Sequence, residues 1–429
     1  MKLGGVFLPH LKITEDISPQ KFPSPKEVTL PMKMHIGKAA NIKVSVGDTV
    51  SVGDVIGEAS GNVSSNIHAT VSGRVQSICS MDMHDGESCL CVKIRSDGED
   101  RLSHNITVPK LTNRKDFIGA LYKSGIVGLG GAGFPTYVKY DIGEKSADTL
   151  IVNCAECEPY ITSDTHTLRD RMAEVCFAVN TIRRFYKDIH VIFVCERKSS
   201  ILKWAREVSR ILGCELKAVG EKYPQGAEKV MIYHTLEREV FLGTLPIDVG
   251  CIVSNVSTIA EVGKYLKTGI PLVRRLVTVD GDAVLCPSVV DVPIGTSTAE
   301  LLEWCGGFKA DVGKILFGGP MMGISVINEN TPILKNVNAV TVLSKEKSYL
   351  PSHSPCIRCG SCLRSCPVSI DSAAVGRAVS KSDYLTAKRL GIEACIECGC
   401  CSYICPAKIS LTENNKRVKQ VLRSMKNDI

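Results

Sequence analysis

The sequence lacks any long uninterrupted hydrophobic run. Its most apolar stretches, such as residues 315–327, are broken by Gly and Pro. None reaches the roughly 18 apolar residues that a membrane-spanning helix needs. The first 16 residues contain an early Lys but neither a long apolar segment nor a small-residue cleavage site, which argues against a secretory signal. We therefore expect a protein of the cytoplasm.

Aromatic residues are also scarce, at 5% of the chain with two Trp, whereas 44% of the residues are hydrophobic. This balance is ordinary for folded domains and gives no reason to expect disorder. A chain of 429 residues is too long for one hydrophobic core, so roughly three or four domains are expected.

The formal net charge is modest, at +7. The densest positive group lies near the C-terminus, where we expect a solvated helix face or a docking surface for an acidic partner or an anionic membrane. A nucleic-acid-binding module would interleave aromatic residues with these charges, and this tail has none. The residues concerned are Lys416, Arg417, Lys419, Arg423 and Lys426.

Cysteine, in contrast, is abundant. Disulfides are rare in cytoplasmic proteins, so 20 Cys residues indicate metal binding or redox chemistry where they cluster. Nine of them fall between Cys356 and Cys405. Most of the others are expected to be small buried hydrophobic residues.

The C-terminal cysteines repeat one motif. The pattern C-x2-C-x2-C-x3-C-P occurs at residues 356–367 and again at 395–406. In two-cluster bacterial ferredoxins, the first three Cys bind one 4Fe-4S cluster and the fourth binds the other. Two ligand sets follow from this rule. They are Cys356, Cys359, Cys362 with Cys405, and Cys395, Cys398, Cys401 with Cys366.

Two structural zinc sites are the alternative for these cysteines. Zinc sites usually show two separated C-x-x-C pairs, whereas here the third Cys and the Cys-Pro ending recur in both halves. Cys400, a ninth thiol, is expected to pack rather than to bind metal. Residues 372–390 are Ala-rich and free of Pro, which predicts a helix and a helical ferredoxin domain rather than a β-type one.

A glycine-rich segment, SGIVGLGGAGFPTYVK, occupies residues 124–139. Its G-x-G-x-x-G spacing is a weak Rossmann signal, because a helix is predicted at 117–123 where that motif needs a strand. Its glycines would still let backbone N–H groups approach a phosphate or a ring, with Lys139 nearby to meet the charge. The glycines are Gly128, Gly130, Gly131 and Gly133.

An acidic segment, NCAECEPY, follows the apolar strand predicted at 149–152. Glu156 and Glu158 could accept hydrogen bonds from ribose or nicotinamide groups at this strand end. Solvated loop charges are the simpler alternative, which the nearby glycine segment disfavours.

These segments together resemble the RnfC family, whose core is similar to the flavoprotein subunit of respiratory complex I. The resemblance is carried by the two cysteine motifs and by residues 128–139, 153–164, 222–229, 248–258 and 318–323. It implies an oxidoreductase component of an ion-translocating NAD:ferredoxin complex. Its expected partners are the other Rnf membrane subunits and a ferredoxin-like subunit, with ferredoxin reached indirectly. The chain would then lie on the inner face of the membrane.

The resemblance further implies FMN, NAD(H) and two 4Fe-4S clusters as cofactors. The FMN phosphate would bind at the glycine segment and Lys139. Asn153, Glu156, Asn255 and Thr258 would surround the ribityl chain and ring, and NADH would lie near Phe134, Glu158 and Glu228. Cys157, Tyr223 and Gly226 complete the implied cofactor contacts. Ala155 and Cys157 replace an Asp and a Ser of the complex I pattern, a departure within the acidic segment.

Two further modules flank this region. Residues 46–56 repeat a Val-Gly-Asp turn and 67–75 alternate as a strand does, which resembles the barrel-sandwich domains of biotinyl and lipoyl carriers. No Lys lies between Gly57 and Gly73, so a packing or interaction role is expected. Residues 276–284 predict a hairpin around an Asp-Gly turn and 298–304 a helix, similar to the family's β-grasp (SLBB) domain and expected to act as a spacer. The Met pair in GGPMMG is expected to be core.

The sequence therefore predicts a multidomain α/β protein. Its parts would be a barrel sandwich (1–105), a Rossmann-like α/β flavin domain (106–268), a β-grasp domain (269–343) and a helical two-cluster ferredoxin domain (344–429), with a linker at 344–355. A flavin is required because a hydride donor cannot feed one-electron clusters directly. Two alternatives stay open: a soluble RnfC-like adaptor serving proline or cobalamin reduction, and a zinc-stabilised nucleic-acid-binding module.

Overall fold

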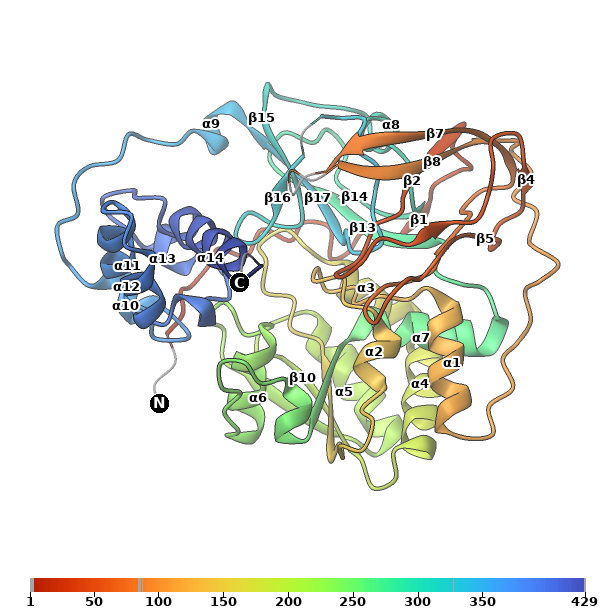
Figure 1. Cartoon of the computed structure of the whole chain (residues 1–429), viewed down its shortest axis with the longest axis horizontal. Coiled ribbons are helices and arrows are strands. Elements are labelled where there is room, and N and C mark those ends of the chain that lie inside the picture. Colours follow the sequence, from red (N-terminus) through yellow and green to blue (C-terminus); the bar gives the residue numbers. More distant parts are fainter. Residues whose placement is uncertain (1–3, 84–85, 87, 327, 428–429) are drawn as a thin grey trace.

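A computed structural model describes residues 4–83, 86, 88–326 and 328–427. The chain forms a multidomain α/β protein in which a cluster of C-terminal helices lies at one end (Figure 1), with Gly4 packed against the backbone of Cys366. Within the described ranges, no helix is long and apolar enough to cross a membrane.

The α/β domain is built on four parallel strands in the order β11-β10-β9-β12. Alternate residues of β9 face opposite sides, so Leu150 and Val152 join the core beneath α4, α5 and α7, while Ile151 joins the core beneath α6. The elements are β9 (Thr149–Asn153), β10 (His190–Glu196), β11 (Glu215–Val219), β12 (Cys251–Asn255), α1 (Arg114–Ser124), α2 (Thr136–Tyr140), α3 (Ser163–Asp170), α4 (Met172–Phe185), α5 (Ile201–Leu212), α6 (Glu228–Leu236), η1 (Pro246–Val249) and α7 (Val256–Thr268).

The strand order of this sheet reverses between β9 and β12. The chain runs from β9 outward to β10 and β11 and then returns to the other side of β9. Asn153 and Asn255 are register partners at the carboxyl ends of these two strands. Ligands of open α/β sheets bind outside the carboxyl ends of the strands at such a reversal. The predicted strand at 149–152 is confirmed, and so is the helix before the glycine segment, which lies in α1.

Two small sheets form the barrel sandwich. The first has the order β2-β8-β7-β4 and the second β3-β5-β6. The single strand predicted at 67–75 is wrong, because the chain leaves one sheet after β6 and enters the other at β7. The strands are β2 (Glu27–Pro31), β3 (Asn41–Ile42), β4 (Thr49–Val50), β5 (Val55–Glu58), β6 (Ile67–His68), β7 (Gly73–Asp82) and β8 (Ser88–Ser96).

The β-grasp domain contains a six-stranded sheet, β1-β14-β13-β17-β15-β16. Its first strand, β1, precedes the barrel-sandwich strands in sequence and pairs with β14. The predicted tight hairpin at 276–284 is wrong: Ala283 donates to the carbonyl of Val342, so the chain turns onto β17 before it returns as β14. The predicted helix at 298–304 is confirmed. The elements are β1 (Gln20–Lys21), β13 (Arg274–Asp280), β14 (Ser288–Pro293), α8 (Thr298–Trp304), β15 (Val312–Phe317), β16 (Ile324–Ser325) and β17 (Ala339–Ser344).

The C-terminal domain is helical, as predicted. The single helix expected at 372–390 is instead two, because Ser382 has a φ of 56° and Asp383 accepts a hydrogen bond from the Thr386 N–H to start the second helix. The expected linker at 344–355 includes the short helix α9. The helices are α9 (Lys345–Ser348), α10 (Ser361–Ser365), α11 (Ser372–Val379), α12 (Tyr384–Arg389), η2 (Ile392–Ala394), α13 (Cys400–Tyr403) and α14 (Leu411–Asn427).

Candidate flavin and iron-sulfur sites

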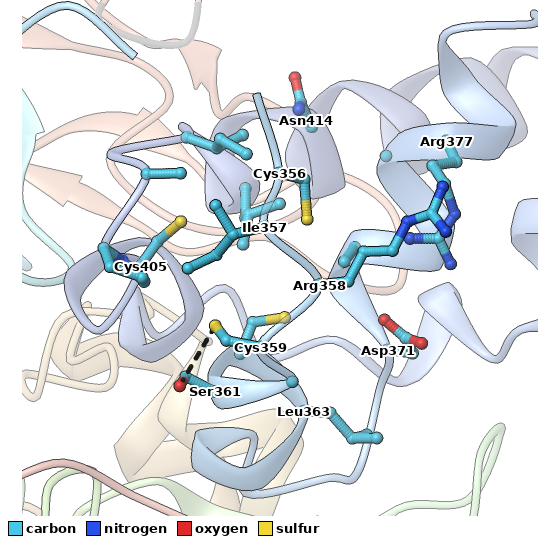
Figure 2. Close-up of a pocket in the computed structure, with 18 of the residues that line it drawn as sticks. Cys356, Ile357, Arg358, Cys359, Ser361, Leu363, Asp371, Arg377, Cys405 and Asn414 are labelled. Atoms are coloured by element: carbon cyan, nitrogen blue, oxygen red, sulfur yellow. Dashed lines mark hydrogen bonds between the residues drawn. The ribbon is translucent and has the colours of Figure 1, made fainter. Parts of the chain in front are cut away.

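Four cysteines of the first predicted ligand set line one cavity of about 580 Å³ in the helical domain. Cys356, Cys359 and Cys362 come from the first motif, and Cys405 comes from the end of the second. Figure 2 shows the sulfur atoms of Cys356 and Cys405 directed toward the space between them. Cys356 and Cys359 are exposed, so this set, which we call the outer thiol set, faces the surface.

The second predicted set lines a separate, much smaller cavity of about 10 Å³. Cys366 comes from the first motif and lies with Cys395, Cys398 and Cys401 of the second. Burial raises the pKa of Cys366, and it raises the pKa of Cys395 to about 11. We call these four residues the inner thiol set.

The cavity of the outer thiol set has room for a group larger than one ion. A zinc ion would need its sulfur ligands about 2.3 Å away. The part of the chain that the structure describes contains no group of three or more His, Cys, Asp or Glu side chains close enough to hold a single metal ion. Four thiols spread around a cavity are instead the donor set that a 4Fe-4S cluster uses.

Cys400 lines the same cavity as the inner thiol set but belongs to neither predicted set. It is fully buried and packs with Val6, Tyr223 and Cys398. Its Sγ donates to the carbonyl oxygen of Tyr223 at 3.7 Å. The hydroxyl of Tyr223 is itself buried and has no hydrogen-bond partner among the described residues.

The glycine segment forms a compact loop at the carboxyl ends of β9 and β12. Gly128 donates to the carbonyl of Phe134 and accepts from the N–H of Gly133. Gly131 and Gly133 have φ values of +113° and +67°, a backbone region that favours glycine. The loop docks on α7, because Leu129 donates to the Thr258 hydroxyl at 2.9 Å.

Three consecutive N–H groups of this loop remain available. Those of Gly130, Gly131 and Ala132 have no acceptor within the described ranges of the chain, and all three residues are exposed. Asn255 lies directly behind Gly130, where an added Cβ would come within 3.3 Å of its side chain. A row of free backbone donors is the arrangement that binds phosphate.

Lys139 and Glu228, predicted to contact FMN and NADH respectively, form an ion pair. The Lys139 Nζ donates to Glu228 Oε1 at 2.9 Å and to the carbonyl of Val253 in β12 at 2.8 Å. The lysine is thereby held across the carboxyl end of the sheet rather than extended into solvent.

The acidic segment and the 222–229 segment are joined by hydrogen bonds. Asn153 accepts from the N–H of Ala155 and donates to the carbonyl of Gly226 at 2.9 Å. The N–H of Gly226 donates to the Cys157 sulfur at 3.2 Å. A side chain at Gly226 would lie 2.9 Å from the carbonyl of Ala155. This close approach of the two backbone segments leaves no room for a side chain, which explains why residue 226 is a glycine.

Glu156 is buried and points inward. Its carboxylate accepts from the N–H of Asp164 and the hydroxyl of Thr165. Burial raises the pKa of Glu156 to about 7, although Lys12 opposes the shift. The Lys12 Nζ lies 3.6 Å from Glu156 Oε2 and also donates to the Glu156 carbonyl. Sequence reasoning missed Lys12, which no local pattern marks.

Asp164 is a second residue not singled out from the sequence, although it ends the 153–164 segment. Its carboxylate accepts from the side-chain amide of Asn255 at 2.6 Å and from the Ser257 hydroxyl. Asn255 also caps α7 through its Oδ1. The polar ends of β9 and β12 thus form one connected network.

Glu158 connects the acidic segment to the GGPMMG turn. Its two carboxylate oxygens accept from the N–H groups of Met321 and Met322, at 3.1 and 2.8 Å. Burial raises its pKa. Gly319 packs against the carboxylate, where a Cβ would lie 2.2 Å from Glu158 Oε2.

The Glu158→Ala variant should slow reduction of the protein by NADH about tenfold, since it loses a charged acceptor of two hydrogen bonds. The absorbance of the iron-sulfur clusters should stay at the wild-type level. Stopped-flow spectroscopy checks the rate. Glu221→Ala, which removes a surface partner of Lys198, is the control. An unchanged rate in Glu158→Ala, or lost cluster absorbance, contradicts this prediction.

Family models match four consecutive regions of the chain. These are the RnfC barrel sandwich hybrid domain at residues 2–99, the Nuo51 FMN-binding domain at 121–264, the SLBB domain at 276–325 and the 4Fe-4S dicluster domain at 350–406. Together with the loop and thiol geometry, they define an iron-sulfur flavoprotein that carries FMN and 4Fe-4S clusters and transfers electrons.

The chain belongs to the RnfC family. It is 36% identical to the C component of the Na(+)-translocating ferredoxin:NAD(+) oxidoreductase complex of Acetobacterium woodii, over 86% of this chain and 84% of that protein. It is 35% identical to the C component of the proton-translocating ferredoxin:NAD(+) oxidoreductase complex of Clostridium ljungdahlii, over 85% and 81% respectively.

One solved structure extends the similarity of fold. A chain of an NAD+-reducing [NiFe]-hydrogenase in the H2-reduced state matches with a TM-score of 0.50 and 15% identity, covering 73% of this chain and 61% of that chain. At this identity the match shows a shared fold.

Proposed function

We propose that this chain exchanges electrons between NADH and a ferredoxin-linked acceptor, as a peripheral subunit of an ion-translocating membrane complex. The names of its relatives support this role, because they are subunits of ferredoxin:NAD(+) oxidoreductase complexes. FMN, when bound, supplies the step between a two-electron donor and one-electron clusters.

The contact between the α/β domain and the inner thiol set carries the proposal. Tyr223 and Cys398 are buried in one cluster, against which Cys157 and Met321 pack. A Cβ on Gly399 would lie 2.9 Å from the carbonyl of Met321. The segments expected to hold FMN therefore touch the loop that carries Cys398. This contact supports electron exchange between the two sites within one chain.

The outer thiol set suits a partner that binds at the surface. Its exposed Cys356 and Cys359 are flanked by an exposed Ile357. Arg358 and Arg377 line the same cavity (Figure 2). A positive rim around an apolar centre favours an electron carrier with an acidic surface.

The chain's own residues would have distinct tasks in this role. The free N–H groups of Gly130, Gly131 and Ala132 would bind the FMN phosphate, with Lys139 adding charge. Asn153 and Asn255 would contact the flavin at the reversal of strand order. The two thiol sets would bind one 4Fe-4S cluster each.

Anaerobic purification followed by iron, zinc and flavin quantitation and NADH titration tests the proposal. We expect about eight Fe and one FMN per chain, and a visible spectrum bleached by NADH. Clusters without flavin, or a spectrum that NADH leaves unchanged, would move the nicotinamide site to another protein.

Membrane association needs a separate measurement. In native membranes, the chain should co-sediment with membrane subunits of the complex and leave only when those subunits are solubilised. Recovery in the soluble fraction, bound to a different reductase, would favour the adaptor function instead.

A further inference from the structure

Three side chains of the β-grasp domain hold the glycine loop and its approach from behind. Arg275, in β13, donates from Nη2 to the carbonyl of Leu129 at 2.5 Å. Lys335 donates from Nζ to the carbonyl of Gly125 at 2.7 Å. The neighbouring Asn336 donates from Nδ2 to the carbonyl of Gly131 at 2.8 Å.

These hydrogen bonds determine where the free N–H groups point. In a trans peptide, the carbonyl of one residue and the N–H of the next lie in one plane and point in opposite directions. Holding the Leu129 carbonyl therefore turns the Gly130 N–H to the opposite side. Holding the Gly131 carbonyl does the same for the Ala132 N–H. The β-grasp donors thus orient two of the three N–H groups available to a phosphate.

Two of these donors are also buried cations. Arg275 is 3% exposed and Lys335 1% exposed. Within the described residues, neither has a carboxylate oxygen within ion-pair distance, 4.0 Å. Burial lowers the pKa of Arg275 to about 10 and that of Lys335 to about 7. Arg275 therefore stays charged at neutral pH, with the carboxylates of Asp164 and Glu261 acting on it from beyond ion-pair distance, whereas Lys335 is only partly charged. A buried cation such as Arg275 favours an anion nearby.

We propose that Arg275, Lys335 and Asn336 make the β-grasp domain part of the phosphate-binding apparatus for FMN. They are positioning residues: they act through the backbone of residues 125–133, and the charge of Arg275 adds a positive field beneath it. The inference rests on the proposed flavin site. It replaces the expected role of this domain as a spacer with a role in cofactor recognition.

The competing explanation is that these side chains only hold neighbouring domains together and play no part in recognising the phosphate. Lys335 also donates to the carbonyl of Asn66 at 2.5 Å and lies 3.5 Å from the Ser65 hydroxyl, so it connects three domains. Loss of a purely structural contact would disturb the whole loop and lower the affinity for every flavin equally. A phosphate-directed field would act only on flavins that carry a phosphate. FMN and riboflavin differ by that group alone, so they separate the two explanations.

The experiment compares the binding of FMN and riboflavin to full-length, flavin-depleted protein by fluorescence quenching. The Arg275→Met and Lys335→Met variants should bind FMN about tenfold or more weakly than wild type. This is the scale of one lost charge-assisted contact. Their affinity for riboflavin should stay within about twofold of wild type. Arg274→Met is the matched control, because Arg274 is the adjacent residue in β13 and pairs with Asp291 instead. It should leave both affinities unchanged.

The Asn336→Asp variant tests the inference even if replacing the buried Arg275 or Lys335 prevents folding. The Asn336 side chain lies at the surface of the loop, and an Asp there replaces the donor to Gly131 with a negative charge. It should weaken FMN more than riboflavin. Equal losses for both flavins in correctly folded variants, or no loss in any of them, would overturn the inference. A wild-type protein that binds neither flavin would overturn the proposed flavin site itself, and this inference with it.

Discussion

The Cys366→Ala variant should lose one cluster and keep the other. Cys366 belongs to the first motif in sequence but lies with Cys395, Cys398 and Cys401 around the inner cavity. A 4Fe-4S cluster needs its four thiolates, so iron content should fall from about eight to about four per chain. Iron quantitation and electron paramagnetic resonance of the reduced protein check this result.

Two companion variants sharpen the test. Cys405→Ala should remove the cluster of the outer thiol set and spare the inner one. Cys400→Ala removes a fully buried thiol of similar surroundings, and should keep both clusters. If Cys366→Ala instead lost the signal that Cys405→Ala loses, the pairing of motifs would be wrong.

The Lys139→Ala variant should lose FMN while keeping its iron. Lys139 is the cation held at the carboxyl end of β12 by Glu228 and the Val253 carbonyl. Removing it takes a positive charge from the proposed phosphate site and leaves the Glu228 carboxylate without that partner. The affinity for FMN should fall about 10- to 100-fold.

Flavin content after purification and cluster absorbance measure the two parts of this result. Lys145→Ala is the control, since Lys145 is an exposed lysine of the same domain paired with Asp248. Loss of cluster absorbance in Lys139→Ala would contradict the assignment of flavin and clusters to separate domains. Full retention of FMN would place the phosphate elsewhere.

Local patterns predicted the chemistry of this protein well. The C-x2-C-x2-C spacing is a short-range property, and the structure gathers the two predicted thiol sets around two cavities. The glycine-rich loop was also recognisable from the sequence, and the positive φ values of Gly131 and Gly133 account for glycine at those two positions. The strand β9 and the helix α8 follow from apolar runs and capping residues within a few positions.

Local sequence patterns predicted strands and turns less reliably where the backbone pairs with segments far away in the chain. Alternation at 67–75 predicted one strand, but the chain there moves between two sheets. The hairpin expected at Gly281 was displaced by a hydrogen bond to Val342, a residue far along the chain. Backbone pairing with segments distant in sequence but within the same domain decided both outcomes.

By itself, the sequence determined which chemical groups this protein carries: two cysteine motifs, a glycine loop, and the acidic and lysine residues that resemble those of RnfC. Only the tertiary structure decided how they are supported. Lys12, Arg275, Lys335 and Asn336 reach the site from segments far away in the chain. Such contacts leave no periodic signal, because a single long-range hydrogen bond constrains one side chain and not its neighbours in sequence.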